Sequence, residues 1–232
     1  MPELPEVENV CRNLSLIIRP DTELKKWYFF RADLRFLIPK KSLNRLEGKK
    51  ITRIWRRAKY ILFDFEQDIL ISHLGMTGKW RQEPTNNWNR KKHDHLAFET
   101  GHGDCLVYED PRRFGFIDVI KNQDLLVKFS KLGVEPLDKD LNFELLTKKF
   151  LKLKKPIKNA IMDQSLIVGV GNIYASEALF RAKINPTRLC SKLKTESYKK
   201  LWREIQAVLK NAIKAGGSTI NDFQNAYGSK GN

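Results

Sequence analysis

Residues 163–180 read DQSLIVGVGNIYASEALF, and this stretch indicates how the C-terminal half of the chain folds. Its two glycines, Gly169 and Gly171, predict a turn, and the pattern after them predicts a helix over 173–183. Asn172 is then a candidate N-cap, because an asparagine side chain can accept a backbone N–H at a helix start. The same N–H groups, together with Asn172, are able to hold a phosphate. A GxG sequence alone does not decide between a phosphate site and an ordinary helix start.

Two further helices are predicted on either side of this stretch, and this half of the chain shows no strand pattern. Residues 143–150 have a helical pattern, and apolar residues at helical spacing over 198–212 predict an amphipathic helix that ends at Gly216-Gly217. Residues 131–140, which include the sequence KLGVEP, predict a linker that separates these helices from the N-terminal part of the chain.

The N-terminal part has a different pattern, in which one helix is followed by many short strands. Residues 2–18 predict a helix, with a proline at its start and apolar residues at helical spacing. Short apolar runs separated by glycine and aspartate then predict an antiparallel sandwich or barrel. These runs are 51–55, 60–65, 69–73, 95–99, 105–109 and 114–120.

The charge of the chain favours a polyanionic partner. Among 232 residues, 43 are Lys or Arg and 27 are Asp or Glu, which gives a formal net charge of +16 and favours nucleic acid as the partner. Ribosome association and binding to an anionic membrane surface are the alternatives. The sequence has no apolar run long enough to span a membrane and no secretory signal, so we expect a cytoplasmic protein. Three distant cysteines argue against a disulfide framework.

The N-terminus carries a candidate nucleophile. Removal of Met1 would leave Pro2 with a free secondary amine, which attacks an aldehyde-like carbon and needs no metal. Glu3 and Glu6 are close enough in sequence to move protons for that amine. The alternative is that proline and glutamate stand there only because helix starts favour them.

Two glycine-bounded turns carry further candidate residues. The sequence SHLGMTG at 72–78 contains His73 and Met76, and DPRRFG at 110–115 contains Arg112 and Phe114. An arginine and a phenylalanine on a turn can form a wedge that enters a base stack. His73 and Met76 have an alternative role as packing residues, and DPRRFG has one as a structural turn.

Taken together and in order, these motifs resemble those of the formamidopyrimidine-DNA glycosylase family. The segments are MPELPEVE at the start, RRAKYILF at 56–63, SHLGMTG at 72–78, DPRRFG at 110–115, DQSLIVGVGNIYASEALF at 163–180 and GGST at 216–219. The resemblance implies an α+β fold of two domains. An N-terminal antiparallel β-sandwich with an N-terminal helix would occupy residues 1–130. A helical domain with a helix–two-turn–helix motif would occupy residues 141–232, with DNA between the domains.

The resemblance also implies an activity, namely a bifunctional DNA glycosylase and AP lyase of base-excision repair. Such an enzyme removes oxidised purines, including 8-oxoguanine and formamidopyrimidines, from damaged double-stranded DNA. Pro2 would attack C1′, expel the base and form a Schiff base that drives β,δ-elimination. Glu3 would shuttle the proton, Glu6 would be the second carboxylate, and Lys59 would contact a phosphate near the lesion.

The remaining site residues are implied by the resemblance in the same way. His73, Lys158 and Asn172 would bind DNA, Lys158 in the handling of 8-oxoguanine and Asn172 as a phosphate ligand. Met76, Arg112 and Phe114 would fill the gap that the flipped base leaves. Residues 216–224 would form a lid over that base, with Asn221 where the family often has arginine. Nothing indicates more than a monomer.

The sequence departs from the family at its C-terminus. Members usually end in a zinc-binding β-hairpin with two CxxC pairs, and no CxxC pair occurs up to Asn232. We therefore expect no zinc ion and no other cofactor. The missing hairpin raises the alternative that the chain is a catalytically weak or inactive DNA-binding relative.

Overall fold

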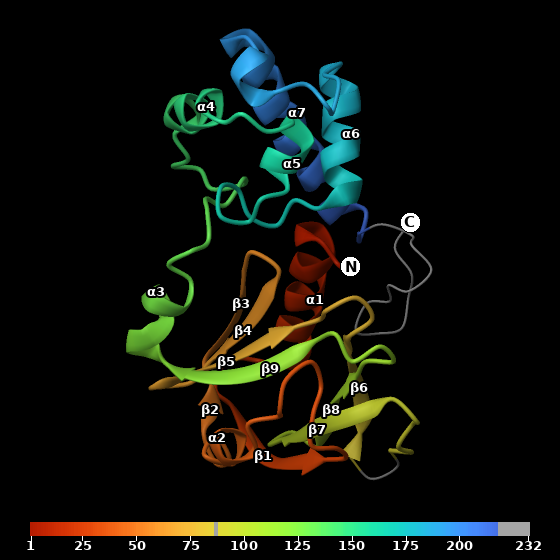
Figure 1. Cartoon of the computed structure of the whole chain (residues 1–232). Helices are drawn as coiled ribbons and strands as arrows, with labels where there is room; N and C mark the ends of the chain where they lie inside the picture. The colour runs from red at the N-terminus through yellow and green to blue at the C-terminus, as the bar shows by residue number, and fades with distance from the viewer. Residues whose placement is uncertain (86–87, 218–232) are drawn as a thin grey trace. The chain divides into compact units, whose positions relative to one another are not determined.

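The computed structural model describes residues 1–85 and 88–217, and these residues form two compact units. The first unit is Met1–Lys128 together with Ala215 to Gly217, and the second is Phe129–Lys214. Figure 1 shows the β-strands and helix α1 in the first unit, and helices α4 to α7 in the second. Each unit is described below by itself.

The first unit begins with helix α1 (Leu4–Ile17). Val7, Val10 and Leu14 recur at helical spacing, and all three are buried in the core of the unit. The helix starts two residues later than the sequence predicts, with Glu3 as its N-cap. Pro2 therefore precedes the helix, and its presence is not explained by a preference of the first helical turn.

Two antiparallel sheets pack together as a sandwich, and α1 packs against strand β3 of one of them. The first sheet has the order β2-β1-β7-β8-β6 and the second has the order β3-β4-β5-β9. The strands are β1 (Thr22–Phe29), β2 (Lys50–Ile51), β3 (Arg53–Arg57), β4 (Tyr60–Asp64), β5 (Asp68–His73), β6 (Lys79–Pro84), β7 (Asp94–Thr100), β8 (Asp104–Glu109) and β9 (Phe116–Lys121). The predicted antiparallel sandwich is confirmed.

The core of the sandwich combines side chains from both sheets. Phe63 and Leu70 of the second sheet belong to one apolar cluster with Phe98 and Leu106 of the first. Trp80 lies among them with its ring edge toward Phe63, and its indole N–H donates to Ser72 Oγ at 3.0 Å. Two short helices, α2 (Lys40–Asn44) and α3 (Leu125–Lys128), flank the strands.

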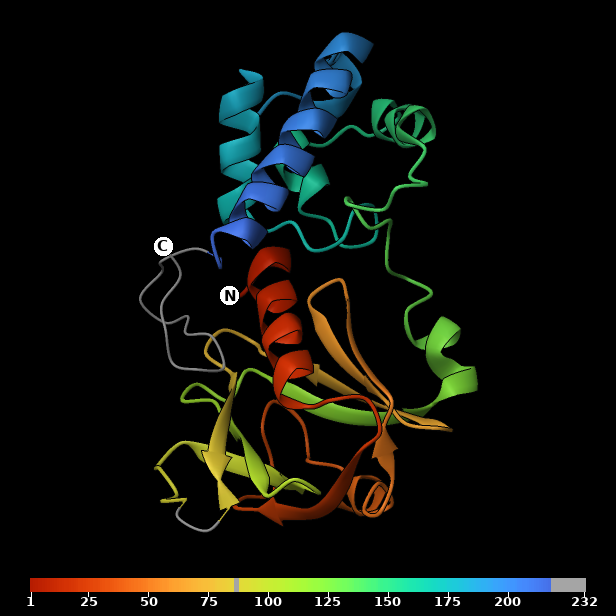
Figure 2. The same cartoon turned by 180° about the vertical axis from the view of Figure 1, so that it is seen from behind.

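The second unit is helical. Its helices are α4 (Phe143–Leu151), α5 (Ile157–Ile161), α6 (Asn172–Ala182) and α7 (Thr195–Lys214). Phe150, Tyr198 and Trp202 pack ring against ring where α4 meets α7, and Figure 2 shows α7 as the longest helix of this unit. The predicted helices at 143–150, 173–183 and 198–212 are confirmed.

The segment 131–140 belongs to the helical unit. Val134 forms a parallel bridge with Ile167, and the Val134 carbonyl accepts from Val168 N–H at 3.0 Å. Gly133 lies so close to Leu166 that a Cβ atom there would overlap the Leu166 backbone. This stretch therefore fastens the loop between α5 and α6.

Candidate active site and nucleic-acid interface

The start of α1 holds two buried carboxylates beside Pro2. Glu3 is 3% exposed and Glu6 is 2% exposed. The two residues form a capping box, in which Glu6 Oε2 accepts from Glu3 N–H at 2.9 Å and the Glu3 carboxylate accepts from Glu6 N–H. Each carboxylate is thus held in place by the backbone. Pro2, half-buried, directly precedes this pair.

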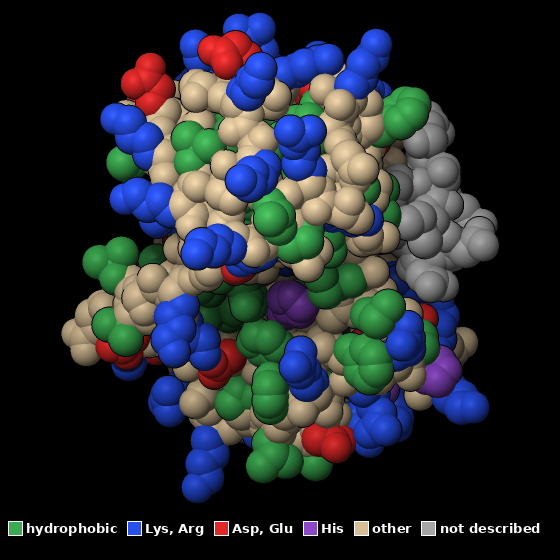
Figure 3. Space-filling model, turned by 45° about the horizontal axis from the view of Figure 1, so that its top comes forward, with side chains coloured by type: hydrophobic (Ala, Val, Ile, Leu, Met, Phe, Trp, Pro, Cys, Tyr) green, Lys and Arg blue, Asp and Glu red, His purple; other side chains and the backbone are tan. Residues whose placement is uncertain are grey.

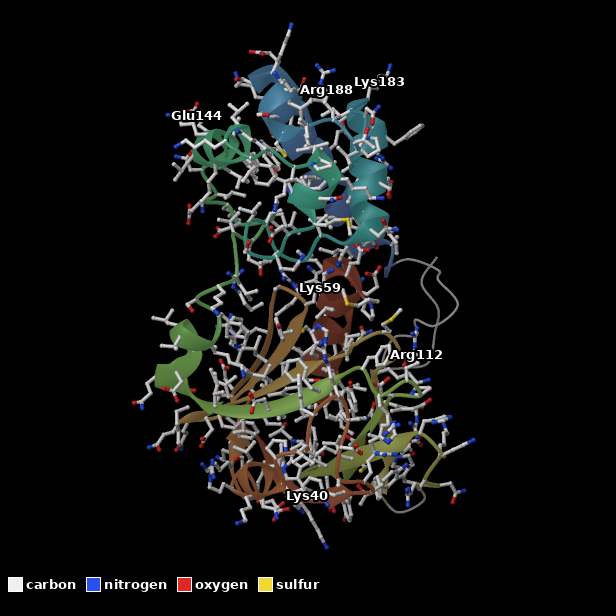
Figure 4. The ribbon with its side chains drawn as sticks, viewed as in Figure 1. Lys40, Lys59, Arg112, Glu144, Lys183 and Arg188 are labelled. Atoms are coloured by element: carbon white, nitrogen blue, oxygen red, sulfur yellow. The ribbon has the colours of Figure 1, made fainter. Side chains whose placement is uncertain are left out.

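Lys59 lies in the two-residue loop between β3 and β4, at the end of the sheet near the start of α1 (Figure 4). Arg57 and Tyr60 are paired across the hairpin, so Ala58 and Lys59 alone make the turn. Ala58 has φ +52°, as two-residue hairpin turns require at their first position. The turn directs Lys59 inward, where it is only 5% exposed.

The electrostatics of Lys59 link it to the two carboxylates. Burial lowers the pKa of the Lys59 ammonium, because the charged form loses hydration, and the charges of Glu3 and Glu6 raise that pKa in part. A lysine is almost never fully buried unless it is paired. The structure therefore brings together Pro2, Glu3, Glu6 and Lys59, the four residues that the sequence singles out for chemistry.

His73 ends strand β5, and its ring is held by aromatic neighbours. It stacks on Phe116 with ring centroids 5.4 Å apart and contacts Tyr60 at 5.1 Å. Burial, together with the positive charges of Lys59 and Arg35, lowers the pKa of His73 to about 4. The imidazole is neutral at pH 7, and its Nδ1 accepts from Gly75 N–H at 3.0 Å. The proton consequently sits on Nε2, which is a donor.

The turns that carry Met76, Arg112 and Phe114 are fastened to each other by Asp110, which is fully buried. Its carboxylate accepts from the Thr77 hydroxyl at 2.5 Å and from Gly115 N–H at 2.9 Å. The same Thr77 oxygen accepts from Arg112 N–H at 3.1 Å. One buried carboxylate thus holds both turns.

Glycine is required where these turns meet. Gly75 has φ +60°, and a Cβ atom there would overlap the backbone of Phe114 and Gly115. On this rigid base the three candidate side chains reach outward: Met76 is 36% exposed, and Phe114 is 45% exposed with the Arg112 guanidinium 4.7 Å from its ring centroid. Figure 4 shows Arg112 on the β8–β9 loop. Exposed apolar side chains on a rigid turn are suited to insertion between bases.

In the helical unit, Lys158 on α5 and Asn172 on α6 are brought together. Lys158 Nζ donates to Ser176 Oγ at 2.9 Å, and that hydroxyl donates to the Asn172 carbonyl at 2.8 Å. The Gln164 side chain holds the loop between the two helices. Its Oε1 accepts from Gly169 N–H and its Nε2 donates to the Val170 carbonyl. Side-chain hydrogen bonds therefore hold the exposed start of α6 and the loop that precedes it.

One prediction about this helix is wrong. Gly171, and not Asn172, is the N-cap of α6, and Asn172 is the first helical residue. Gly171 has an extended backbone and its carbonyl accepts from Ala175 N–H at 3.0 Å, which makes it the cap. The Asn172 side chain is exposed and does not cap the helix, so it can point toward a ligand at the positive helix end.

Lys and Arg side chains greatly outnumber Asp and Glu on the face of the molecule drawn in Figure 3. This distribution agrees with the net charge of +16. Among the described residues, no helix is both long and apolar enough to cross a membrane. Of the predicted lid, only Gly216 and Gly217 are described, and Asn221 lies outside the described residues.

The cysteines do not fit a zinc ion. Cys11, Cys105 and Cys190 are each free and buried at separate places. Within residues 1–85 and 88–217, no three His, Cys, Asp or Glu side chains gather as metal ligands. A structural zinc site takes four such ligands.

Sequence reasoning missed Asp110 and the pair formed by Arg56 and Glu8. Asp110 is part of DPRRFG, but nothing in that motif shows that its carboxylate also fastens Thr77. Arg56 Nε donates to Glu8 Oε2 at 3.0 Å, across 48 positions of sequence. No local pattern could have revealed that contact.

Comparison with known proteins decides the family. The formamidopyrimidine-DNA glycosylase N-terminal domain matches residues 1–117, and the H2TH domain of the same enzymes matches residues 132–224. The chain belongs to the formamidopyrimidine-DNA glycosylase family. A formamidopyrimidine-DNA glycosylase of Bdellovibrio bacteriovorus is 45% identical over 231 residues, which cover 100% of this chain and 85% of the relative. One of Rickettsia felis is 44% identical over 97% of this chain and 82% of that relative.

Solved structures of the family agree in fold. The Lactococcus lactis Fpg in complex with DNA that contains an abasic site has a TM-score of 0.88 and 36% identity, over 99% of this chain and 84% of that one. A MutM in complex with DNA that contains carbocyclic 8-oxo-G has a TM-score of 0.88 and 37% identity, over 98% and 85%. The predicted α+β fold with its helical C-terminal unit is thereby confirmed for this glycosylase family member.

Proposed function

We propose that this chain is a base-excision-repair DNA glycosylase and AP lyase that removes oxidised purines from double-stranded DNA. The observation that carries the proposal is the buried group at the start of α1. Glu3 and Glu6, almost fully buried, stand beside Pro2, which no helix preference explains, and Lys59 is buried against the same carboxylates. Such charges are expensive to bury, and groups of this kind concentrate at functional sites.

The chemistry follows from the nature of the amine. Once Met1 is removed, the Pro2 nitrogen is a secondary amine that forms a bond to C1′ of the damaged nucleotide as the bond from C1′ to the base breaks. The Pro2 nitrogen loses its proton as this bond forms, and the Glu3 carboxylate is placed to take that proton and pass it to the departing base. The sugar ring then opens: the C1′–O4′ bond breaks, O4′ takes a proton, and an iminium forms between C1′ and the Pro2 nitrogen. This iminium makes the C2′ proton acidic, so that elimination breaks the strand on the 3′ side, and a second elimination breaks it on the 5′ side. Amine–aldehyde chemistry of this kind uses no metal ion.

The other candidate residues bind and deform the DNA. A base within a duplex is inaccessible, so it must be flipped out and its space filled. Phe114, Arg112 and Met76 reach outward for that purpose. His73 offers a neutral Nε2–H donor to the backbone, and Asn172 with Lys158 offers a phosphate site at the positive end of α6. The net charge of +16 supplies affinity without regard to sequence.

Borohydride trapping tests this function. The purified chain is mixed with duplexes that contain either 8-oxoguanine opposite cytosine or an abasic site, and sodium borohydride reduces any Schiff base to a stable adduct. Intact mass measured beforehand shows whether Met1 is absent. We expect an adduct and strand cleavage on both duplexes, and strong loss of both with Pro2→Gly.

The outcomes separate the proposal from its alternative. An adduct at the abasic site alone would mean that the nucleophile works without recognition of the damaged base. No adduct on either duplex, with Met1 absent, would contradict enzymatic function and leave a DNA-binding relative. Since its proposed substrate is chromosomal DNA, we also propose that the protein acts in the bacterial cytoplasm. We propose that it does so as a monomer.

A further inference from the structure

One arginine, Arg56, joins the hairpin loop that presents Lys59 to helix α1. Arg56 Nη1 donates to the Ala58 carbonyl at 2.9 Å, and Arg56 Nε donates to Glu8 Oε2 at 3.0 Å. Glu8 lies on α1, whose start carries Glu3 and Glu6. The guanidinium therefore connects the backbone beside Lys59 to the helix beside Pro2.

The loop needs such support because its conformation is unfavourable. Ala58 has φ +52°, a region that costs a residue with a Cβ atom and that glycine adopts freely. Ala58 is also only 1% exposed, so its carbonyl requires a partner within the protein. The bond from Arg56 satisfies that carbonyl and restrains the turn that aims Lys59.

The Arg56 side chain is largely buried, so its position is fixed by its surroundings. Its side chain is 10% exposed and that of Glu8 is 24% exposed, whereas Arg12, the other arginine on Glu8, is 60% exposed. Helix α1 packs directly on strand β3, which carries Arg56. In Figures 1 and 2 the β3–β4 hairpin and α1 run side by side in both views.

We propose that Arg56, anchored on Glu8, is a positioning residue that holds the Ala58–Lys59 turn at the catalytic end of α1. The fork of the guanidinium makes the two bonds at once, one to the backbone of the turn and one to the helix. A misplacement of about 1 Å at a reacting group can cost 100-fold in rate. This inference rests on the proposed glycosylase function, because that function gives Lys59 its task.

A second role for Arg56 would be a direct contact with DNA. Glu8, Arg12, Arg53 and Arg56 line a groove of about 550 Å³. A phosphate bound there would be attracted by the same cations. The two roles differ in what they change, since a phosphate contact changes affinity and salt dependence while a positioning residue changes the rate of the bound complex.

Single-turnover trapping on an abasic duplex separates the roles. Arg56→Gln and Arg56→Lys are compared with wild type, and Arg12→Gln is the matched control because it removes the exposed arginine from the same carboxylate. We expect both Arg56 variants to trap about 10- to 100-fold more slowly at saturating enzyme, with the DNA Kd within twofold of wild type. Arg56→Lys keeps the charge but cannot form the two-pronged contact, so it should not rescue the rate.

A pH profile adds a readout that loss of stability does not move. A loosened turn would expose Lys59 and return its lowered pKa toward the ordinary value. Under the proposed function the charged Lys59 ammonium contacts a phosphate near the lesion, so the alkaline limb of the trapping rate should move to higher pH in both Arg56 variants. Rates are normalised to the fraction of enzyme that binds DNA, which removes any effect of misfolded protein. Arg12→Gln should keep the wild-type rate within twofold and the wild-type profile.

Several results would overturn the inference. One is an unchanged trapping rate in Arg56→Gln, and another is full rescue by Arg56→Lys. A weaker Kd with a salt slope reduced by about one would assign Arg56 to a phosphate instead. If wild type itself fails to trap, the proposed function fails, and this outcome is distinct from a wild type that traps as fast as its Arg56 variants.

Discussion

The two groups of candidate residues are built in opposite ways. At the start of α1, Glu3, Glu6 and Lys59 are almost fully buried and tied to the backbone or to one another. At the start of α6, Asn172 is exposed and Lys158 is held by one side-chain bond to Ser176. Under the proposed function, the residues assigned to the chemistry are therefore preorganised at a cost in hydration, while those assigned to a phosphate keep their hydration until DNA binds.

The turns that carry Met76, Arg112 and Phe114 combine a buried support with exposed side chains. Asp110 is fully buried and fixes the backbone, while Phe114 and Arg112 stand exposed on top of it. The backbone of these turns is therefore held rigidly, while the side chains that they carry are exposed to solvent. A side chain that must enter a base stack needs both properties, because a mobile wedge would lose entropy on insertion.

The largest effect is expected at the buried carboxylates. Glu3→Gln should lower single-turnover base excision by about 10²- to 10⁴-fold, because the expelled base loses its proton donor. Folding should persist, since the glutamine oxygen can still accept from Glu6 N–H in the capping box. The measurement is release of 8-oxoguanine from a duplex, with Glu23→Gln, an exposed glutamate of the same unit, as control.

A smaller loss of excision in Glu3→Gln would change the role of the buried carboxylates. If Glu3→Gln excises within tenfold of wild type, burial at the start of α1 has a structural purpose only. If excision falls while trapping at a preformed abasic site persists, the carboxylate acts in loss of the base and not in activation of Pro2.

The second effect concerns the exposed wedge. Phe114→Ala should lower excision from duplex DNA about 10- to 100-fold, because the stacking that fills the vacated space is lost. The free energy of unfolding should stay within about 0.5 kcal/mol of wild type, since the ring is exposed. Phe180→Ala, which removes another exposed ring, should leave excision unchanged; equal losses in both variants would argue against a wedge.

The third effect is a pH dependence that originates at His73. Its pKa is about 4 in the folded chain against 6.5 for the free side chain, so the unfolded state binds more protons between these values. The stability that His73 contributes is present above pH 6.5 and is lost as the pH falls toward 4. Between pH 7 and pH 5 this amounts to about 2 kcal/mol.

Urea unfolding at pH 7 and pH 5 measures that loss directly. His73→Gln should lose about 2 kcal/mol less than wild type over the same interval, because glutamine does not titrate. Equal losses in the two proteins would place the acid sensitivity elsewhere and would contradict a buried, neutral imidazole.

The smallest effect is expected in the helical unit. Lys158→Ala should weaken DNA binding several-fold for damaged and undamaged duplexes alike, and should reduce the slope of log K against log salt by about one. Lys210→Ala, on the exposed side of α7, is the control, and an equal effect there would show that only net charge matters.

Asn172→Ala should weaken DNA binding with little change in that slope. Its free energy of unfolding should stay within about 0.5 kcal/mol of wild type, because Asn172 does not cap α6.

The sequence predicts the elements whose signals are local. The helix at 198–212 and the apolar face of α1 follow from spacing alone, because one buried stripe fixes a helix. The sequence does not predict strand β1, because TELKKWYF mixes charged residues with the positions that become buried. The sequence predicts the N-cap of α6 one residue too late, because the pattern shows a turn but not which carbonyl accepts the first helical hydrogen bond.

The sequence identifies the candidate residues of the site, but it does not identify the contacts that hold them in place. Pro2, Glu3 and Lys59 stand in recognisable motifs, and their roles remain predictions. The contacts that hold them join distant segments, as Arg56 joins Glu8 and Asp110 joins Thr77. Such pairs are created by packing, and no local pattern in one sequence encodes them.

Under the proposed function the Pro2 amine is the nucleophile, and its chief competitor is the Lys59 amine with its lowered pKa. The direct measurement is mass spectrometry of tryptic peptides from the borohydride-reduced adduct. Trypsin cuts after Arg12, so Pro2 is carried by peptide 2–12, which contains no lysine. We predict that the reduced sugar is found on peptide 2–12, at residue 2. An adduct on the peptide that contains Lys59, with peptide 2–12 unmodified, would contradict the assignment of Pro2 as the nucleophile.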